Sequence, residues 1–222
     1  MGIDVSTIKF LKDLEKNNNR EWFQSNKDKY ENTLQNIKDV SAEVKEKLSK
    51  KDLIEDAKVF RIYRDVRFSK DKAPYKNNLG VHFTRATKKL RGGYYLHIQP
   101  GESFAGGGFW APSPEDLKRI RDEFAFDTKT IRKITSGKTF VKYFGTLGGD
   151  ELKTAPSGYD RNHPGIDLIR KKQFVVMRKF TDKEVTDKNF VKEVVATFEA
   201  MRPFFDYMSE VLGSDINGQQ IS

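Results

Sequence analysis

The chain has no cysteine and only three histidines among its 222 residues. The missing cysteine excludes disulfide bonds, thiolate metal ligands and cysteine nucleophiles, and so few histidines argue against a multi-histidine metal centre. Long apolar runs are missing as well, so the sequence predicts neither a signal peptide nor a membrane-spanning segment. We therefore expect a cytoplasmic protein without a membrane partner, and no motif implies a metal or another cofactor.

The chain is rich in charged and aromatic residues. Its 41 basic and 32 acidic residues give a net charge of +9, which favours anionic partners such as nucleic acid, nucleotides or acidic surfaces. No block of lysine and arginine exceeds a few residues, so a soluble basic protein with mixed charges is the plainer alternative. The 17 phenylalanines supply much of the apolar volume and indicate a folded core.

The spacing of apolar residues changes from helical to extended and back to helical along the chain. Ser6 is expected to cap a first helix, and a three-to-four-residue period over Asn19–Lys50 predicts one long second helix. Ser113 followed by Pro114 is a strong helix start, and Pro203 is expected to kink or split the last helix. The predicted segments are a helical part over 1–50, a sheet-rich part over 58–110, helices and loops over 113–170, a strand over 173–180 and C-terminal helices over 187–213.

These segments predict an α+β fold. The sheet should be mainly antiparallel or mixed, with about five strands, because "GYYLHIQ" and "SFAGGGFW" flank the turn signal "PGE" and are predicted to form a hairpin. N-terminal and C-terminal helices would pack on this sheet. Since no repeat or low-complexity linker interrupts the chain, we expect residues 1–222 to form a single domain.

The most distinctive stretch is "RDVRFSKDKAPYK", Arg64–Lys76. A period of two over Val59–Phe68 predicts a strand in this region. The outer face of that strand carries three charged residues, Arg61, Asp65 and Arg67. Asp65 would be ionised between the two guanidinium groups and would hold them in place. Arg64 falls on the apolar side, where an arginine needs a buried partner or a ligand.

The second half of this stretch is predicted to be a turn stiffened by Pro74. The turn would present four hydrogen-bond donors, on Lys70, Lys72, Tyr75 and Lys76. Convergent donors on a stiff frame suit a phosphate or a carboxylate. The alternative is a salt-bridged strand end followed by a solvated loop, in which the charges only satisfy one another. Arg121 joins the candidate ligand-binding residues, because it points to the buried side of its predicted helix.

Three weaker features each have a functional and a structural interpretation. Gly106–Gly108 requires something to approach the backbone closely, and a bulge or packed aromatic rings is favoured over a ligand. His97 is either a general base on an open sheet face or a hydrogen-bonded strand histidine. The segment "PSGYDRNHPG" is an ordered loop in which Tyr159, Asp160 and His163 could exchange protons, and a purely structural loop is the favoured reading.

Several segments of the chain resemble a known protein family. The matching segments are "NNNREWF", "FRIYRDVRFSKDKAPYK", "GYYLHIQPGESFAGGGFW" and "PSGYDRNHP". Together they resemble an uncharacterised family of bacterial and some fungal proteins, the domain-of-unknown-function family twenty-four sixty-one. The resemblance spans nearly the whole chain and implies one domain, but no established activity, cofactor or catalytic residue. Ala73 and Ser157 depart from the family pattern, which has threonine and commonly a basic residue there.

Three functions are compatible with these features. The first is a cytosolic protein whose concave sheet face binds a phosphate-bearing or other anionic small molecule. The candidate ligand-binding residues are Arg61, Arg64, Arg67, Lys70, Lys72, Tyr75, Lys76 and Arg121. Catalysis there is left open, with Asp65, His97 and His163 as weak candidates. The second function is nucleic-acid binding, with Tyr63, Tyr75 and Trp110 as stacking residues. The third is an interaction module without chemistry. The oligomeric state is left open.

Overall fold

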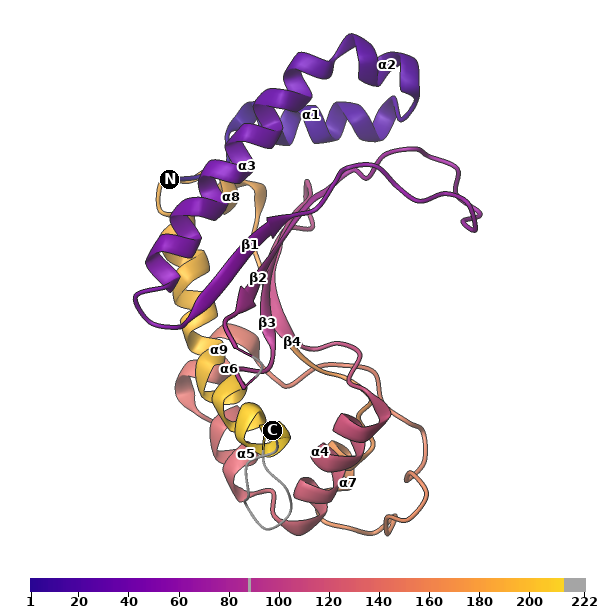
Figure 1. Ribbon diagram of the computed structural model, residues 1–222, viewed down its shortest axis with the longest axis vertical. Helices are drawn as coiled ribbons and strands as arrows, with labels where there is room; N and C mark the ends of the chain where they lie inside the picture. Colours follow the sequence, from indigo (N-terminus) through magenta and orange to yellow (C-terminus); the bar gives the residue numbers. More distant parts are fainter. Residues whose placement is uncertain (88, 214–222) are drawn as a thin grey trace. The chain divides into compact units, whose positions relative to one another are not determined.

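A computed structural model of the protein describes residues 1–87 and 89–213 (Figure 1). Its elements, in chain order, are α1 (Val5–Lys16), α2 (Arg20–Ser25), α3 (Lys27–Leu48), β1 (Ile54–Val59), β2 (Leu79–Arg85), β3 (Gly93–Ile98), β4 (Phe104–Phe109), α4 (Pro114–Phe126), α5 (Lys129–Thr135), α6 (Lys138–Phe144), α7 (Ile166–Ile169), β5 (Phe174–Lys179), α8 (Asp182–Thr186) and α9 (Phe190–Gly213).

The five strands form one antiparallel sheet in the order β1-β2-β3-β4-β5, so each strand pairs with its neighbour in the sequence. β3 and β4 form the hairpin that the "PGE" turn predicts. The α+β class, with five strands and helices from both ends of the chain, is therefore confirmed.

Contacts between Cα atoms divide the chain into two compact units. Unit 1 contains Met1–Thr84, Tyr95–Ala105 and Lys179–Ala196. Unit 2 contains Arg85–Tyr94, Gly106–Arg178 and the chain from Thr197 onward. Each unit is described by itself below.

The N-terminal helices of unit 1 are organised by asparagines. α1 is preceded by Asp4 as its N-cap, so Ser6 lies inside the helix and the predicted cap was wrong. Asn19 caps α2, because its side chain accepts a hydrogen bond from the Trp22 N–H. The single long helix predicted from residue 19 was also wrong. Asn26 interrupts it, since its amide donates to the Trp22 carbonyl while its φ of −123° leaves the helical range.

The strand predicted over Val59–Phe68 was wrong, because β1 lies earlier in the chain. The 60–78 segment is a loop, with one antiparallel bridge between Tyr63 and Tyr75. Ile62 and Phe68 were expected on one apolar strand face, but Ile62 is 1% exposed and Phe68 is 97% exposed. Alternation in this stretch therefore does not reflect a buried sheet face.

In unit 2 the local signals at the helix ends are accurate. Ser113 caps α4 by accepting a hydrogen bond from the Asp116 N–H, with Pro114 at the first turn.

α9 continues through Pro203, so the proline does not split the helix. α9 also packs on the sheet, where the Tyr94 ring lies 4.9 Å from the Phe198 ring and 5.0 Å from the Phe205 ring, measured between centroids.

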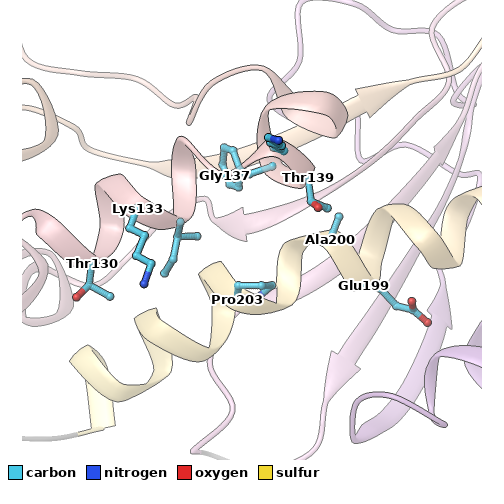
Figure 2. A pocket seen from close by; sticks show the side chains of 10 residues that line it. Thr130, Lys133, Gly137, Thr139, Glu199, Ala200 and Pro203 are labelled. Atoms are coloured by element: carbon cyan, nitrogen blue, oxygen red, sulfur yellow. The ribbon is translucent and has the colours of Figure 1, made fainter.

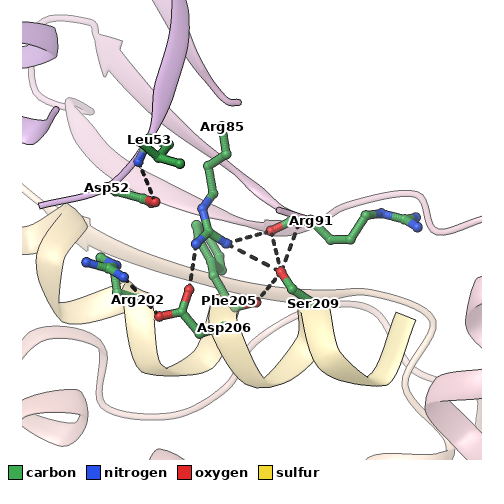
Figure 3. A network of polar contacts seen from close by, with 8 residues as sticks. All are labelled: Asp52, Leu53, Arg85, Arg91, Arg202, Phe205, Asp206 and Ser209. Atoms are coloured by element: carbon green, nitrogen blue, oxygen red, sulfur yellow. Dashed lines mark hydrogen bonds and ion pairs between the residues drawn. The ribbon is translucent and has the colours of Figure 1, made fainter. Parts of the chain in front are cut away.

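A buried arginine joins β2 to α9 within unit 2 (Figure 3). The Arg85 side chain is 0% exposed, and its Nη2 donates to Asp206 Oδ1 at 2.5 Å. Its Nη1 donates to the Arg91 carbonyl at 3.0 Å. Asp206 also accepts from Arg202 Nη2 at 3.2 Å, so one carboxylate serves two guanidinium groups. Because a buried cation needs an anionic partner, Asp206 is expected to be important for stability.

Replacing Asp206 with asparagine should therefore lower the free energy of unfolding by about 2 kcal/mol, since it removes a charge that faces a buried guanidinium. Urea unfolding followed by circular dichroism measures this loss. Asp167→Asn is the matched control, because Asp167 pairs with Arg132 on the surface. This substitution should lower the free energy of unfolding by less than about 1 kcal/mol. Equal losses in the two variants would contradict the assignment.

Candidate functional site

A polar cleft of about 630 Å³ lies in unit 1. Its wall is built from the end of α1, the 60–78 loop and β3. The lining residues are Glu15, Asn18, Arg64, Asp71, Ala73, Tyr75, Lys76, Asn77, Asn78 and Tyr95. The cleft thus includes part of the distinctive "RDVRFSKDKAPYK" stretch, together with residues that lie far from it in the sequence.

Asn18 attaches the 60–78 loop to the N-terminal helices. Its side-chain amide donates to the Tyr75 carbonyl at 2.9 Å, and its oxygen accepts from the Tyr75 N–H at 3.1 Å. The Tyr75 ring stacks on Phe23 of α2 with the centroids 4.0 Å apart and the planes at 11°. The "NNN" and "APYK" motifs are therefore parts of one structural unit, although residues 18 and 75 are far apart in the sequence.

The base of the loop is held by backbone pairing. The Arg64 N–H donates to the Pro74 carbonyl at 2.9 Å, and the Lys76 N–H donates to the Ile62 carbonyl at 2.8 Å. These two bonds flank the bridge between Tyr63 and Tyr75. The pairing fixes the backbone at Arg64 and Lys76, the two cations of the cleft.

The Arg64 guanidinium binds the Asp71 carboxylate, which comes from the tip of the same loop. A backbone hydrogen bond from Ala73 lowers the pKa of Asp71, and the hydrogen bond from Arg64 lowers it further, so Asp71 is ionised at neutral pH. The Asp71 side chain is 61% exposed. Arg64 is therefore a partly buried loop residue and does not lie on the apolar face of a strand, and its partner is a solvent-exposed carboxylate.

Lys76 is the second cation. Its ammonium lies 5.9 Å from the centroid of the Phe60 ring, a cation–π distance. Within the part of the chain that the structure describes, no ion pair involves Lys76. Asn77 donates to Glu15 Oε1 at 3.0 Å across the cleft. The lining therefore contains one cation paired with a surface carboxylate and one that no carboxylate neutralises.

Tyr95 connects the cleft to a chain of hydrogen bonds along β3. Tyr95 Oη lies 3.3 Å from His97 Nδ1, and His97 Nε2 lies 2.9 Å from Gln99 Oε1. Gln99 Nε2 donates to Glu102 Oε2 at 2.6 Å. Since a carboxylate only accepts, the direction of the chain assigns the hydrogen of His97 to Nε2 and leaves Nδ1 to accept from the Tyr95 hydroxyl.

Burial lowers the pKa of His97 and raises that of Tyr95, so both groups are neutral at pH 7. A neutral imidazole that accepts at Nδ1 has the form of a base toward the tyrosine hydroxyl. His97 is thus a hydrogen-bonded strand histidine, one of its two sequence interpretations. Its role as a catalytic base stays a prediction.

Several predicted residues lie outside the cleft lining. Arg67 donates to Asp65 through Nε at 3.0 Å and Nη2 at 2.6 Å, and these side-chain hydrogen bonds lower the pKa of Asp65. Lys72 Nζ donates to the Val66 carbonyl at 3.0 Å. Arg61 and Lys70 are exposed. Of the predicted ligand-binding residues, Arg64, Tyr75 and Lys76 line the cleft.

Tyr75 is placed differently from the expectation of a presented hydroxyl. The residue is 4% exposed, and burial raises the pKa of its hydroxyl, with the neighbouring Tyr63 adding to the effect. Its ring is therefore a structural anchor against Phe23, and its buried face does not suit the stacking role considered for nucleic acid. Tyr63 and Trp110, also considered for stacking, are exposed.

The candidates in unit 2 have structural partners. Arg121 Nε donates to the Ile169 carbonyl at 2.9 Å, and burial lowers its pKa. The Tyr159 hydroxyl donates to Asp122 at 2.7 Å, and burial, with this hydrogen bond, raises its pKa to about 12. His163 Nδ1 accepts from the Gly165 N–H at 3.0 Å, which fixes the loop as its His-Pro sequence predicts.

A second hollow, of about 550 Å³, lies in unit 2 between α5, α6 and α9 (Figure 2). Thr130 and Lys133 line one wall, and Glu199, Ala200 and Pro203 line the other. Its surface is mostly apolar, and none of the predicted site residues lines it. The polar cleft of unit 1 is therefore the better candidate for binding a charged molecule.

Among residues 1–87 and 89–213, no group of three or more His, Asp or Glu side chains is placed to hold a metal ion. In those residues no helix combines the length and the apolar character needed to cross a bilayer.

The fold and the cleft define the class: an α+β protein whose polar cleft is assembled around its most distinctive loop. The family model described as "Conserved hypothetical protein (DUF2461)" matches residues 6–207, and the chain belongs to this family. The resemblance noted in the sequence is thereby confirmed. Comparison with curated proteins found no match, and comparison with solved structures found none.

Sequence reasoning missed five residues of the cleft: Glu15, Asn18, Asn77, Asn78 and Tyr95. Two of the three consecutive asparagines mark helix boundaries, since Asn17 is the C-cap of α1 and Asn19 is the N-cap of α2. Three consecutive asparagines exceed what a helix boundary needs, and this excess is the signal that could have identified Asn18.

Proposed function

We propose that unit 1 binds a phosphate-bearing or other anionic small molecule in the cleft, on Arg64 and Lys76. The observation that carries the proposal is the contact between Arg64 and Asp71. A guanidinium that binds a carboxylate through one of its nitrogens has the donors that a phosphate group also requires. Asp71 thus occupies the place that the ligand's anionic group takes.

Displacing Asp71 requires little free energy. Its side chain is 61% exposed, and an ion pair at such a position contributes about 0–1 kcal/mol. Asp71 belongs to the loop tip, so it can turn into solvent when a ligand replaces it. A ligand with two negative charges should bind more strongly than the Asp71 carboxylate does, because it interacts with Lys76 as well as with Arg64.

Lys76 supports the proposal because its charge is not neutralised by a carboxylate within the described part of the chain. Asn78 lines the same cleft and supplies an amide donor, whereas the Asn77 amide donates to Glu15. A guanidinium, an ammonium and an amide on a backbone fixed by hydrogen bonds form a preorganised anion site.

Isothermal titration calorimetry with inorganic pyrophosphate tests the proposal through variants with opposite expected signs. Arg64→Gln should weaken pyrophosphate binding about tenfold, because a charge-assisted bidentate contact is lost. Asp71→Asn should strengthen binding about threefold, since it removes the competing carboxylate. Arg67→Gln is the matched control, because Arg67 lies in the same loop and pairs with Asp65 outside the cleft lining.

Absence of pyrophosphate binding to the unaltered protein would overturn the proposal. So would equal affinities of the Arg64→Gln and Arg67→Gln variants, because the interaction would then depend only on net charge. A catalytic role for Asp65, His97 or His163 is not part of this proposal, which concerns binding.

A further inference from the structure

A row of rings crosses the sheet of unit 1 beside the cleft. The centroid separations are 6.3 Å for Phe60 and Tyr95, 5.8 Å for Tyr95 and Phe104, and 4.9 Å for Phe104 and His97. The last two rings are nearly parallel, at 19°. We call Phe60, Tyr95, Phe104 and His97 the aromatic row. Tyr95 belongs both to this row and to the cleft lining.

The aromatic row lies on the face of β3 opposite the buried core. Side chains alternate along a strand, and Leu96 and Ile98 are fully buried whereas Tyr95 and His97 are partly exposed. Phe60, at the end of β1, is 37% exposed. Rings on the buried face would only fill the core, whereas rings on this face meet solvent and can accept a planar ligand.

Gly80 of β2 makes room for this arrangement. A Cβ atom at residue 80 would lie 2.5 Å from the Tyr95 hydroxyl oxygen and 3.1 Å from its ring carbons, so any other residue would displace the ring. The absence of a side chain on Gly80 leaves the space on the neighbouring strand that the Tyr95 ring and hydroxyl occupy. The position of the ring is thus fixed by the sequence of two strands.

Cationic and aromatic groups meet at the Phe60 end of the row. The Lys76 ammonium lies 5.9 Å from the Phe60 centroid, and Lys76 also lines the cleft. A ligand that fills the cleft with an anionic group therefore has aromatic surface immediately beside it. Ligands with a phosphate at one end and a flat, π-rich group at the other match both features.

We propose that the ligand is a nucleotide whose phosphate binds Arg64 and Lys76 and whose base stacks on the aromatic row. This inference rests on the proposed function, because the phosphate uses the same cleft. A mononucleotide fits better than a nucleic-acid strand. The cleft offers two cations to one phosphate group, whereas a strand requires a track of cations along several phosphates.

Titration calorimetry with four probes separates the contributions of phosphate and base. The probes are inorganic pyrophosphate, ribose 5-phosphate, adenosine 5′-monophosphate and a single-stranded oligonucleotide series of increasing length. The nucleotide should bind about tenfold more tightly than ribose 5-phosphate, the usual order of effect for one stacked base. Phe104→Leu and Phe60→Leu should each reduce this preference severalfold. Phe104→Leu should also leave ribose 5-phosphate affinity unchanged, whereas Phe60→Leu removes the ring beside the Lys76 ammonium and is read only through the preference.

Phe68→Leu is the matched control, because Phe68 is exposed on the same loop but stands outside the row. Circular dichroism checks whether Phe104→Leu folds, and Phe60→Leu provides a second variant at a more exposed ring. Equal affinities for adenosine 5′-monophosphate and ribose 5-phosphate would overturn the nucleotide assignment and leave the anion site standing. Failure of both pyrophosphate and ribose 5-phosphate to bind would overturn both proposals. Affinity that rises with oligonucleotide length beyond the mononucleotide would overturn the assignment in favour of a nucleic-acid surface.

Discussion

Replacing Gly108 with alanine is expected to destabilise the protein by about 4 kcal/mol, enough to abolish soluble expression in a marginally stable domain. Gly108 has a φ of +133°, and a Cβ atom there would lie 2.2 Å from the Phe174 carbonyl oxygen and 2.8 Å from the Val175 Cα. These atoms belong to the backbone of β5, which cannot turn aside like a flexible side chain. Backbone strain and overpacking therefore act together.

Soluble yield and urea unfolding measure this effect, and Gly101→Ala is the control. Gly101 also has a positive φ, of +76°, but nothing lies within 4 Å of the Cβ atom that alanine would add. Gly101→Ala should lower the free energy of unfolding by about 1 kcal/mol, from the backbone conformation alone. If both variants lost the same free energy, the contact with β5 would not be the cause.

The second large effect is expected at Asn18, where leucine should destabilise unit 1 by about 3 kcal/mol. The substitution removes both hydrogen bonds to the Tyr75 backbone, and each buried backbone group left without a partner costs about 1–3 kcal/mol. Pyrophosphate affinity should fall as well, because the loop that carries Arg64 and Lys76 loses its attachment. Urea unfolding and calorimetry on the same variant test both consequences.

Asn18→Asp refines this test. The carboxylate can still accept from the Tyr75 N–H but would face the Tyr75 carbonyl, so one favourable contact becomes repulsive. Asn18→Asp should lower the free energy of unfolding by about as much as Asn18→Leu does. Asn32→Asp is the matched control on the exposed side of α3 and should change stability by less than about 0.5 kcal/mol. A stable Asn18→Asp variant would show that the donor half of the amide does not matter.

Elements with local signals could be predicted from the sequence. The start of α4 follows from Ser113 and Pro114, because a cap and a first-turn proline act within a few residues of the helix they begin. The β3–β4 hairpin follows from its turn for the same reason. The three glycines were expected to allow close packing, and a Cβ at Gly107 would indeed lie 2.9 Å from the Phe205 ring.

Features that depend on distant parts of the chain could not be predicted. The Val59–Phe68 stretch alternates like a strand, but most of it belongs to the 60–78 loop, because Asn18 and Phe23 bind Tyr75 in place of a neighbouring strand. The need of Arg64 for a partner was recognised, whereas the partner, Asp71, lies in the stretch that the sequence predicts to be a turn. Tyr95 was missed because its role depends on Gly80 in the adjacent strand.

The division into two units has a consequence for synthesis of the protein. The chain passes between the units inside β2, β3, β4, β5 and α9, so each unit is assembled from three separated stretches. On the ribosome, the N-terminal helices and the cleft loop emerge long before Lys179–Ala196, which completes unit 1. Neither unit can therefore complete its folding before the stretch of α9 that belongs to it has been synthesised.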